Sequence, residues 1–198
     1  MSRGMLIATV LTIAFGIFWF AYYKDIYLDS KKSPDKLKTE GWELHDAGEI
    51  DKAAEKFRKA IEKDDRFAPA HFGLGSCYNQ QGNYDKAKDY FLRVLELKPD
   101  YYTARISYAR CIIRLGGKRA EAQRTAQQEI DKVPKSVYAD MNLAYNFAAY
   151  YAVTGDSGRA IDWLTYAISK NSSMRARAKK DKDFEMLRDS KMFQRLVD

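Results

Sequence analysis

The sequence predicts an all-α protein in which pairs of helices stack side by side behind a single transmembrane helix. Three observations lead to this fold class. Glycine, alanine and phenylalanine recur at an interval of 34 residues, which is typical of a helix-turn-helix solenoid. Only four of the 198 residues are proline and 31% are charged, a composition suited to exposed helices. Near the N-terminus, residues 5–23 carry no charge.

Residues 5–23 follow a short tail, residues 1–4, and are predicted to cross a membrane. As a helix this stretch is about 28 Å long, close to the thickness of the hydrocarbon layer. Trp19 and Tyr22 lie near its end, ahead of Lys24, as in an interfacial aromatic belt with a cationic stop. A cleaved signal peptide is the alternative, but it requires small residues where this segment has bulky ones.

Charge around this segment predicts its orientation. Arg3 precedes it, whereas five lysines follow it: Lys24, Lys31, Lys32, Lys36 and Lys38. The positive-inside rule therefore places the rest of the chain in the cytoplasm, with the periplasm as the alternative.

Small residues recur every four positions along the predicted anchor, at Gly4, Ala8, Thr12 and Gly16. This spacing lets a second helix approach closely, although small residues are also common in such segments by chance. A polar connector, residues 24–33, follows the anchor and ends at Ser33-Pro34, a favourable helix start.

The internal repeat is clearest in residues 68–101, where small residues occur at the predicted helix crossing. Gly75 and Ala87 leave room for the partner helix, and Gly82 suits a left-handed turn between the two helices. Pro99 ends the second helix, because proline cannot continue it.

This unit resembles the tetratricopeptide repeat (TPR) family. The residues that fill the family's pattern are Leu74, Gly75, Tyr78, Ala87, Phe91 and Pro99. His71 stands where the family prefers tryptophan, so we expect it to be a packing residue. The resemblance implies a right-handed solenoid with four helix pairs and a C-terminal cap, over units 34–67, 68–101, 102–136, 137–170 and 171–198.

The later units depart from the pattern. In the third, Ala126 replaces the large aromatic residue, so its second helix should pack loosely. In the fourth, we expect a longer first helix over about residues 136–153. Residues 171–198 resemble the closing module of bacterial TPR arrays, which covers the open end of the stack. We therefore expect a single-pass protein of the bacterial inner membrane.

No constellation of residues indicates catalysis. His45 and His71 are the only histidines, and neither they nor Cys77 and Cys111 form a metal-binding pattern. We expect no enzyme activity, cofactor, metal or small-molecule substrate. The net charge of +7 favours acidic partners, anionic lipid or nucleic acid, but the basic run at 174–182 lacks interleaved aromatics. We expect it to be solvated, with no nucleic-acid partner.

The resemblance implies that the first helix of each pair lines a partner-binding groove. The residues carried over to that face are Lys38, Trp42, His45, Phe72, Ser76, Asn79, Ile106, Arg110, Ile113 and Tyr145. Aromatics beside Lys38 and Arg110 suit a segment with apolar and acidic residues. Alternatively, Trp42 and Phe72 pack between helices. Replacing Trp42 and Arg110 by alanine should weaken binding and leave the fold intact.

These features predict a membrane-anchored protein-protein interaction scaffold, as an accessory or structural subunit of a membrane protein complex. A transient assembly factor or chaperone for such a complex is the alternative. An enzyme or a nucleic-acid-binding regulator is a third, less favoured hypothesis.

Overall fold

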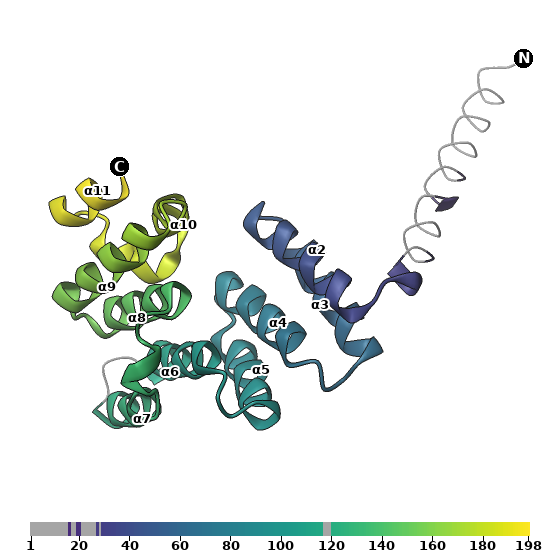
Figure 1. The fold of residues 1–198 in the computed structure, drawn as a ribbon, viewed down its shortest axis with the longest axis horizontal. Coiled ribbons are helices and arrows are strands. Elements are labelled where there is room, and N and C mark those ends of the chain that lie inside the picture. Colours follow the sequence, from purple (N-terminus) through teal and green to yellow (C-terminus); the bar gives the residue numbers. More distant parts are fainter. Residues whose placement is uncertain (1–15, 17–18, 21–26, 28, 117–119) are drawn as a thin grey trace, which may run out of the picture.

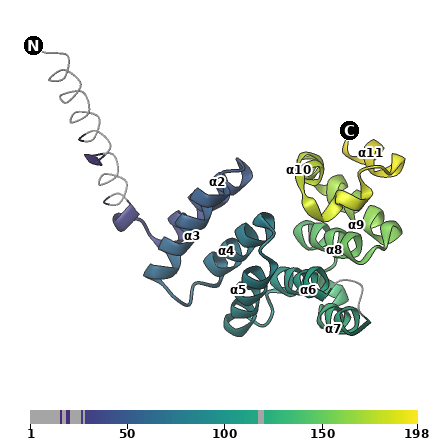
Figure 2. The same ribbon diagram turned by 180° about the vertical axis from the view of Figure 1, so that it is seen from behind.

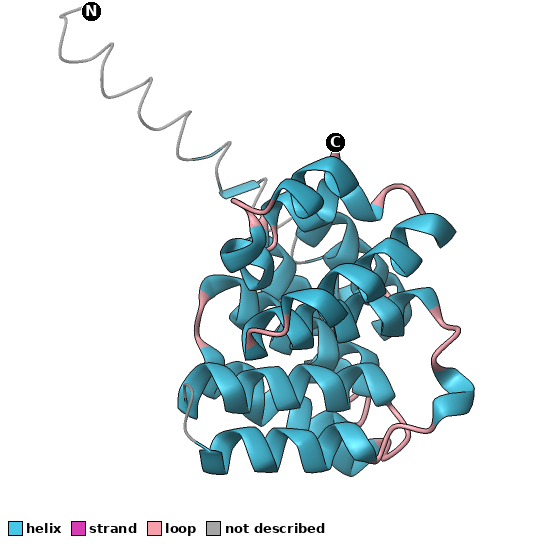
Figure 3. Cartoon of the chain, turned by 90° about the vertical axis from the view of Figure 1, so that its left-hand side faces the viewer, coloured by secondary structure: helices cyan, strands magenta, loops and turns pink. Residues whose placement is uncertain are grey.

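The computed structural model describes residues 16, 19–20, 27, 29–116 and 120–198. Over these residues the chain is built from helices and loops (Figures 1 and 3). The helix pairs are α2 (Pro34–Asp46) with α3 (Ile50–Lys63), α4 (Ala68–Gln81) with α5 (Tyr84–Leu97), α6 (Tyr102–Gly116) with α7 (Ala120–Asp131), and α8 (Met141–Thr154) with α9 (Ser157–Lys170). The 3-10 turn η1 (Lys135–Val137) precedes α8, and α10 (Met174–Lys180), η2 (Lys182–Leu187) and α11 (Lys191–Val197) complete the chain.

Left-handed glycines make the turns within three of these pairs. Gly48, Gly82 and Gly155 have φ angles of 84°, 83° and 88°, a region that side chains with a Cβ rarely adopt. The turn predicted at Gly82 is confirmed. Gly116 differs from the other members of the 34-residue series, because it ends α6 and a Cβ there would lie 2.3 Å from the Cβ of Ala122.

Large aromatics fill the crossings that glycine leaves open. The Phe57 ring is fully buried and lies where Cβ atoms on Gly41 and Gly73 would stand, so α3 packs tightly on α2 and α4. Phe91 occupies the same place beside Gly75, where an added Cβ would be 2.9 Å from its Cε1 atom. The close approach predicted at Gly75 is confirmed. Burial of these rings is a main source of stability for the first two pairs.

The third pair is less regular. In the first two junctions, α3 packs on α4 and α5 packs on α6, but α8 packs mainly on α6 instead of α7. A cleft of about 770 Å³ lies between α7 and the turn that joins α8 to α9. Ala126 is fully buried on α7, where it contributes only a methyl group to the cluster that contains Ile130 and Phe147. This arrangement agrees with the loose packing predicted there.

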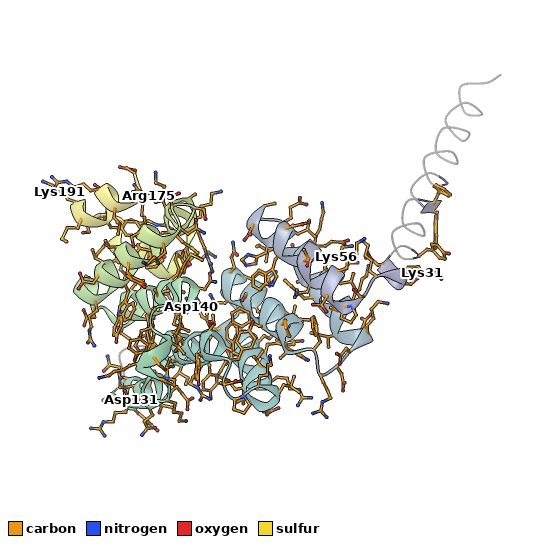
Figure 4. The ribbon with its side chains drawn as sticks, viewed as in Figure 1. Lys31, Lys56, Asp131, Asp140, Arg175 and Lys191 are labelled. Atoms are coloured by element: carbon orange, nitrogen blue, oxygen red, sulfur yellow. The ribbon has the colours of Figure 1, made fainter. Side chains whose placement is uncertain are left out.

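The first helix of the fourth pair begins later than the sequence suggested. The expectation of a helix over 136–153 is wrong at its start, because η1 is a separate turn and α8 begins at Met141. Asp140 explains the break, since its carboxylate accepts a hydrogen bond of 2.8 Å from the backbone N–H of Leu143 (Figure 4). An aspartate in this position caps a new helix.

The C-terminal segment covers the end of the stack opposite α2 and α3 (Figure 2). Helices α10 and α11 contact α9, whereas η2 lies on α8. Phe184, Phe193 and Val197 are buried against the α8–α9 pair, so this segment shields an apolar surface that would otherwise face water.

The connector is joined to α3 by an ionic cluster. Asp29 is buried, and its carboxylate lies 2.9 Å from Lys32, 2.7 Å from Lys56 and 2.9 Å from Lys59. Lys63 adds a hydrogen bond of 2.8 Å to the backbone carbonyl of Ser30. Lys56 and Lys59 both belong to α3, and Lys56 is labelled in Figure 4. The cluster therefore fixes residues 29–32 on the first helix pair.

Most of the predicted anchor lies outside the described residues, including Gly4, Ala8 and Thr12. Gly16, Trp19 and Phe20 are described, and each is helical and exposed. Among the residues that the structure describes, no helix has both the length and the hydropathy to cross a membrane.

Candidate partner-binding face

The predicted groove residues fall into two groups on the first helices of the pairs. On α2 and α4, all of them are partly exposed; we call this group the open half, and it consists of Lys38, Trp42, His45, Phe72, Ser76 and Asn79. On α6 and α8, all of them are buried; we call this group the covered half, and it consists of Ile106, Arg110, Ile113 and Tyr145.

An aromatic pair forms the centre of the open half. The rings of Trp42 and Phe72 lie 6.0 Å apart and join α2 to α4. Beneath them, Trp42 meets Phe57 edge-on at 5.2 Å, and Phe72 lies 5.5 Å from Phe91. The two rings therefore pack between helices, which was the alternative to groove binding in the sequence analysis. They still present part of their surface to solvent. Anchored in this way, they lose little freedom when a partner binds.

Polar groups border the aromatic pair. Lys38 lies 2.9 Å from Asp35, and Asn79 accepts a long contact of 3.9 Å from the thiol of Cys111. The Ser76 hydroxyl donates to the carbonyl of Phe72 at 2.9 Å, so it is satisfied within its own helix. The contacts of Lys38 and Ser76 lie within their own helices, whereas that of Asn79 reaches α6, and all three side chains remain partly exposed to a partner.

His45 adds an ionisable group at the end of α2. Its ring packs edge-on to Trp42 at 5.2 Å, and its Nδ1 atom lies 3.6 Å from Asp46. Burial lowers the pKa of His45, and the positive charge of Arg177 on α10 lowers it further, whereas Asp46 and Asp181 oppose this. At neutral pH the imidazole is therefore uncharged.

Two covered-half residues belong to the core. Ile106 is fully buried and Ile113 is 5% exposed, and both pack in one cluster with Ala126, Ile130 and Phe147. The groove assignment of Ile106 and Ile113 is thus corrected: they fill the space between α6, α7 and α8. The cause is the direct packing of α8 on α6, which turns these side chains inward.

The other two covered-half residues are bound by the chain's own C-terminal segment. Arg110 is 6% exposed, and its guanidinium pairs with the carboxylate of Asp183 at 3.0 Å. The Tyr145 hydroxyl donates to Asp181 at 2.9 Å, and its ring meets Phe184 edge-on at 5.6 Å. The groove assignment of these two side chains is likewise corrected, because neither is free for a partner in this conformation.

We call residues 181–187 the strap. Besides Arg110, it is held by Arg114, which contacts the Asp183 carboxylate at 2.8 Å and the Lys182 carbonyl at 3.1 Å. Burial raises the pKa of Tyr145 well above its usual range, and the nearby charge of Asp181 raises it further, so the phenol remains a hydrogen-bond donor. Replacing Arg110 by alanine would remove one of the two cations that pair with the buried Asp183, so we expect the variant to be destabilised, contrary to the expectation from the sequence.

One pattern in the sequence indicates the strap but was not used in the prediction. Asp181 interrupts the basic run and Asp183 follows it directly, and a carboxylate among cations is often a pairing partner. The family resemblance placed this segment over the end of the stack, so its crossing of the α6–α8 face was missed.

Chemistry elsewhere in the described residues is limited. His71 is buried, and its Nε2 atom lies 2.8 Å from the Asp65 carbonyl, in keeping with a structural role. Burial raises the pKa of Cys77 and of Cys111 to about 12, so neither thiol forms a nucleophilic thiolate at neutral pH. No group of three or more metal-ligating side chains gathers in the described part of the chain.

Stacked helix pairs with left-handed glycine turns define a TPR-type α-solenoid. Residues 68–101 match the model of the tetratricopeptide repeat family. No curated protein sequence matches the chain. One similar solved structure, described as a MamA RS-1 ArsTM double mutant, is 13% identical with a TM-score of 0.48, covering 82% of this chain and 89% of that one. YrrB, described as a TPR protein with an unusual peptide-binding site, is 20% identical with a TM-score of 0.32, covering 81% and 98%.

Proposed function

We propose that this protein is a membrane-tethered scaffold, an accessory subunit that binds a partner protein of a membrane complex through its open half. The observation that carries the proposal is the partly exposed Trp42–Phe72 pair, held from below by Phe57 and Phe91. Aromatic side chains fixed in this way and bordered by polar groups are typical of protein-binding hot spots.

The polar groups of the open half favour binding over catalysis. The Ser76 hydroxyl is engaged by a backbone carbonyl, and His45 lies against Trp42 and Asp46. Neither is arranged as a nucleophile with its base, which would require the two side chains to share a hydrogen bond. Their chemistry instead suits hydrogen bonds at the edge of an interface.

Tethering is the second part of the proposal. The uncharged stretch 5–23 would anchor the chain in the bacterial inner membrane, with the solenoid in the cytoplasm or, alternatively, the periplasm. The ionic cluster around Asp29 supports this, because it would hold the solenoid in a fixed direction relative to the anchor. A tether of this kind raises the effective concentration of the open half near membrane partners.

The test is a crosslinking pull-down of full-length protein from native membranes, comparing Ser76→Arg with Ser169→Arg. Both serines donate to a backbone carbonyl of their own helix, at 2.9 Å and 2.7 Å, so losing either hydroxyl costs little. Arginine at 76 would obstruct the open half, whereas 169 lies on the exposed surface of α9.

We expect wild type and Ser169→Arg to retain one partner and Ser76→Arg to lose it. Equal recovery from all three would refute the assignment of the open half. A partner that stays stoichiometric in mild detergent supports a subunit, whereas a substoichiometric client would identify a transient assembly factor.

A further inference from the structure

The strap occupies part of the face that a partner would use. Its Asp183 is 4% exposed, with one carboxylate oxygen 3.0 Å from Arg110 and the other 2.8 Å from Arg114. Phe184, the next residue, is fully buried against Tyr145. Asp183 and Phe184, an acidic residue followed by an aromatic one, thus lie across α6 and α8. The aromatic and cationic residues of this face are suited to bind such a pair.

The carboxylate site belongs to α6 and not to the strap. Arg110 and Arg114 are four residues apart, so they project from the same side of the helix. The Ser107 hydroxyl accepts a hydrogen bond of 3.4 Å from Arg110 and donates to Asn146 of α8 at 3.4 Å. Two guanidinium groups on one side of α6, of which Arg110 is also bonded to Ser107, form a pre-organised receptor for one carboxylate. An apolar cover for the end of the stack would not require such a receptor.

The strap packs on α8 through three buried side chains. Its helical part is a six-residue 3-10 turn, a geometry with weaker hydrogen bonds than an α-helix. Asp183, Phe184 and Leu187 point inward, whereas Glu185 and Met186 are exposed, the latter to 72%. Helices α10 and α11, on either side of the strap, make their own contacts with α9, so displacement of the strap alone would not remove the contacts that hold them.

We propose that the strap is an internal competitor, and that the partner carries an acidic-aromatic segment like Asp183-Phe184 which displaces it from α6 and α8. This inference rests on the proposed function, because it assumes that the partner continues from the open half onto the covered half. The exchange replaces one carboxylate with another, so Arg110 is never left buried without a counter-charge.

The experiment uses the full-length chain and a labelled peptide with the sequence of residues 179–189, measured by fluorescence anisotropy. In the variant Asp183→Asn/Phe184→Ala, the strap has lost its competing groups. Apparent affinity scales with the fraction of open receptor, so we expect the variant to bind the peptide at least about tenfold more tightly than wild type. A control peptide with asparagine at positions 181 and 183 should bind neither protein.

Equal binding of the peptide to wild type and to the folded variant would overturn the proposal, as would equal binding of the control peptide. If the double variant does not fold, hydrogen exchange of the wild-type protein is the second test of the proposal. The strap amides should then exchange faster than those of α8, by local opening. If the amides of the strap and of α8 both exchange at the rate of global unfolding, the proposal that the strap opens is refuted. Loss of the partner in Ser76→Arg alongside a failed strap test would leave the proposed function standing.

Discussion

Gly73→Ala tests the packing that organises the first two helix pairs. The mutation places one methyl group at the crossing of α4 with α3, where it would lie 2.3 Å from Cε1 and 2.5 Å from Cζ of Phe57. Carbon atoms in good contact are about 3.5–4.0 Å apart. On its other side the ring lies close to Gly41 of α2, where an added Cβ would stand 2.7 Å from the same Cε1 atom, so little room remains for the ring to shift towards α2.

The expected magnitude follows from two opposing effects. Overpacking of a buried site costs roughly 1–3 kcal/mol. Alanine regains about 0.5–1 kcal/mol over glycine in a helix interior. A contact as short as 2.3 Å places the overpacking cost in the upper part of this range, about 2–3 kcal/mol. The net loss should therefore be about 1–2.5 kcal/mol, which corresponds to a fall in Tm of roughly 2–10 °C in a chain of this size.

Thermal and urea unfolding, followed by far-UV circular dichroism, measure this change. Gly158→Ala is the matched control, because its new Cβ would meet only Asp156 at 3.7 Å on the surface of α9. We expect the control to match wild type or exceed it slightly. A Gly73→Ala protein as stable as the control would refute the packing argument.

Three further predictions concern other parts of the chain. Gly75→Leu should lower the free energy of unfolding by roughly 1–3 kcal/mol or more, because its side chain meets Phe91; urea unfolding measures it. Burial raises the pKa of Asp29, but hydrogen bonds from Lys56, Lys32 and Lys59 outweigh burial and hold that pKa below its usual range. The carboxylate therefore stabilises the fold above its unfolded pKa of about 3.9, and this contribution fades as the pH falls further. Asp29→Asn should lower Tm at pH 7, and the difference in Tm between the variant and wild type should shrink at acid pH. A difference in Tm that does not change with pH would contradict the stabilising role of the ionic cluster. Cys77 and Cys111 should react with a thiol reagent at pH 8 only after unfolding, since burial raises their pKa values to about 12; rapid labelling of the native protein would contradict their burial.

Local patterns predicted the repeated helix pairs because their causes are local. Gly82 must adopt positive φ and Gly75 must admit Phe91, and both requirements recur with the 34-residue spacing. The helix start at Ser33-Pro34 is confirmed for the same reason, since the Ser33 hydroxyl accepts from the N–H of Lys36 within one turn.

Features that depend on distant segments were not predictable in this way. The Ile106 side chain points inward because α8 packs on α6. That packing depends on the space beside α6 that the side chains of α7 do not fill. The pairing of Arg110 with Asp183 joins residues far apart in the chain. Positional analogy to a repeat family indicates which side of a helix faces the groove, but it does not indicate whether another segment lies there.

The most direct test of the central claim is site-specific photo-crosslinking in native membranes. A photoreactive amino acid at position 76 lies in the open half, and one at position 169 lies on the exposed surface of α9. We predict one discrete adduct with a partner protein from position 76 and none from position 169. The same adducts from both positions, or none from position 76, would contradict the account.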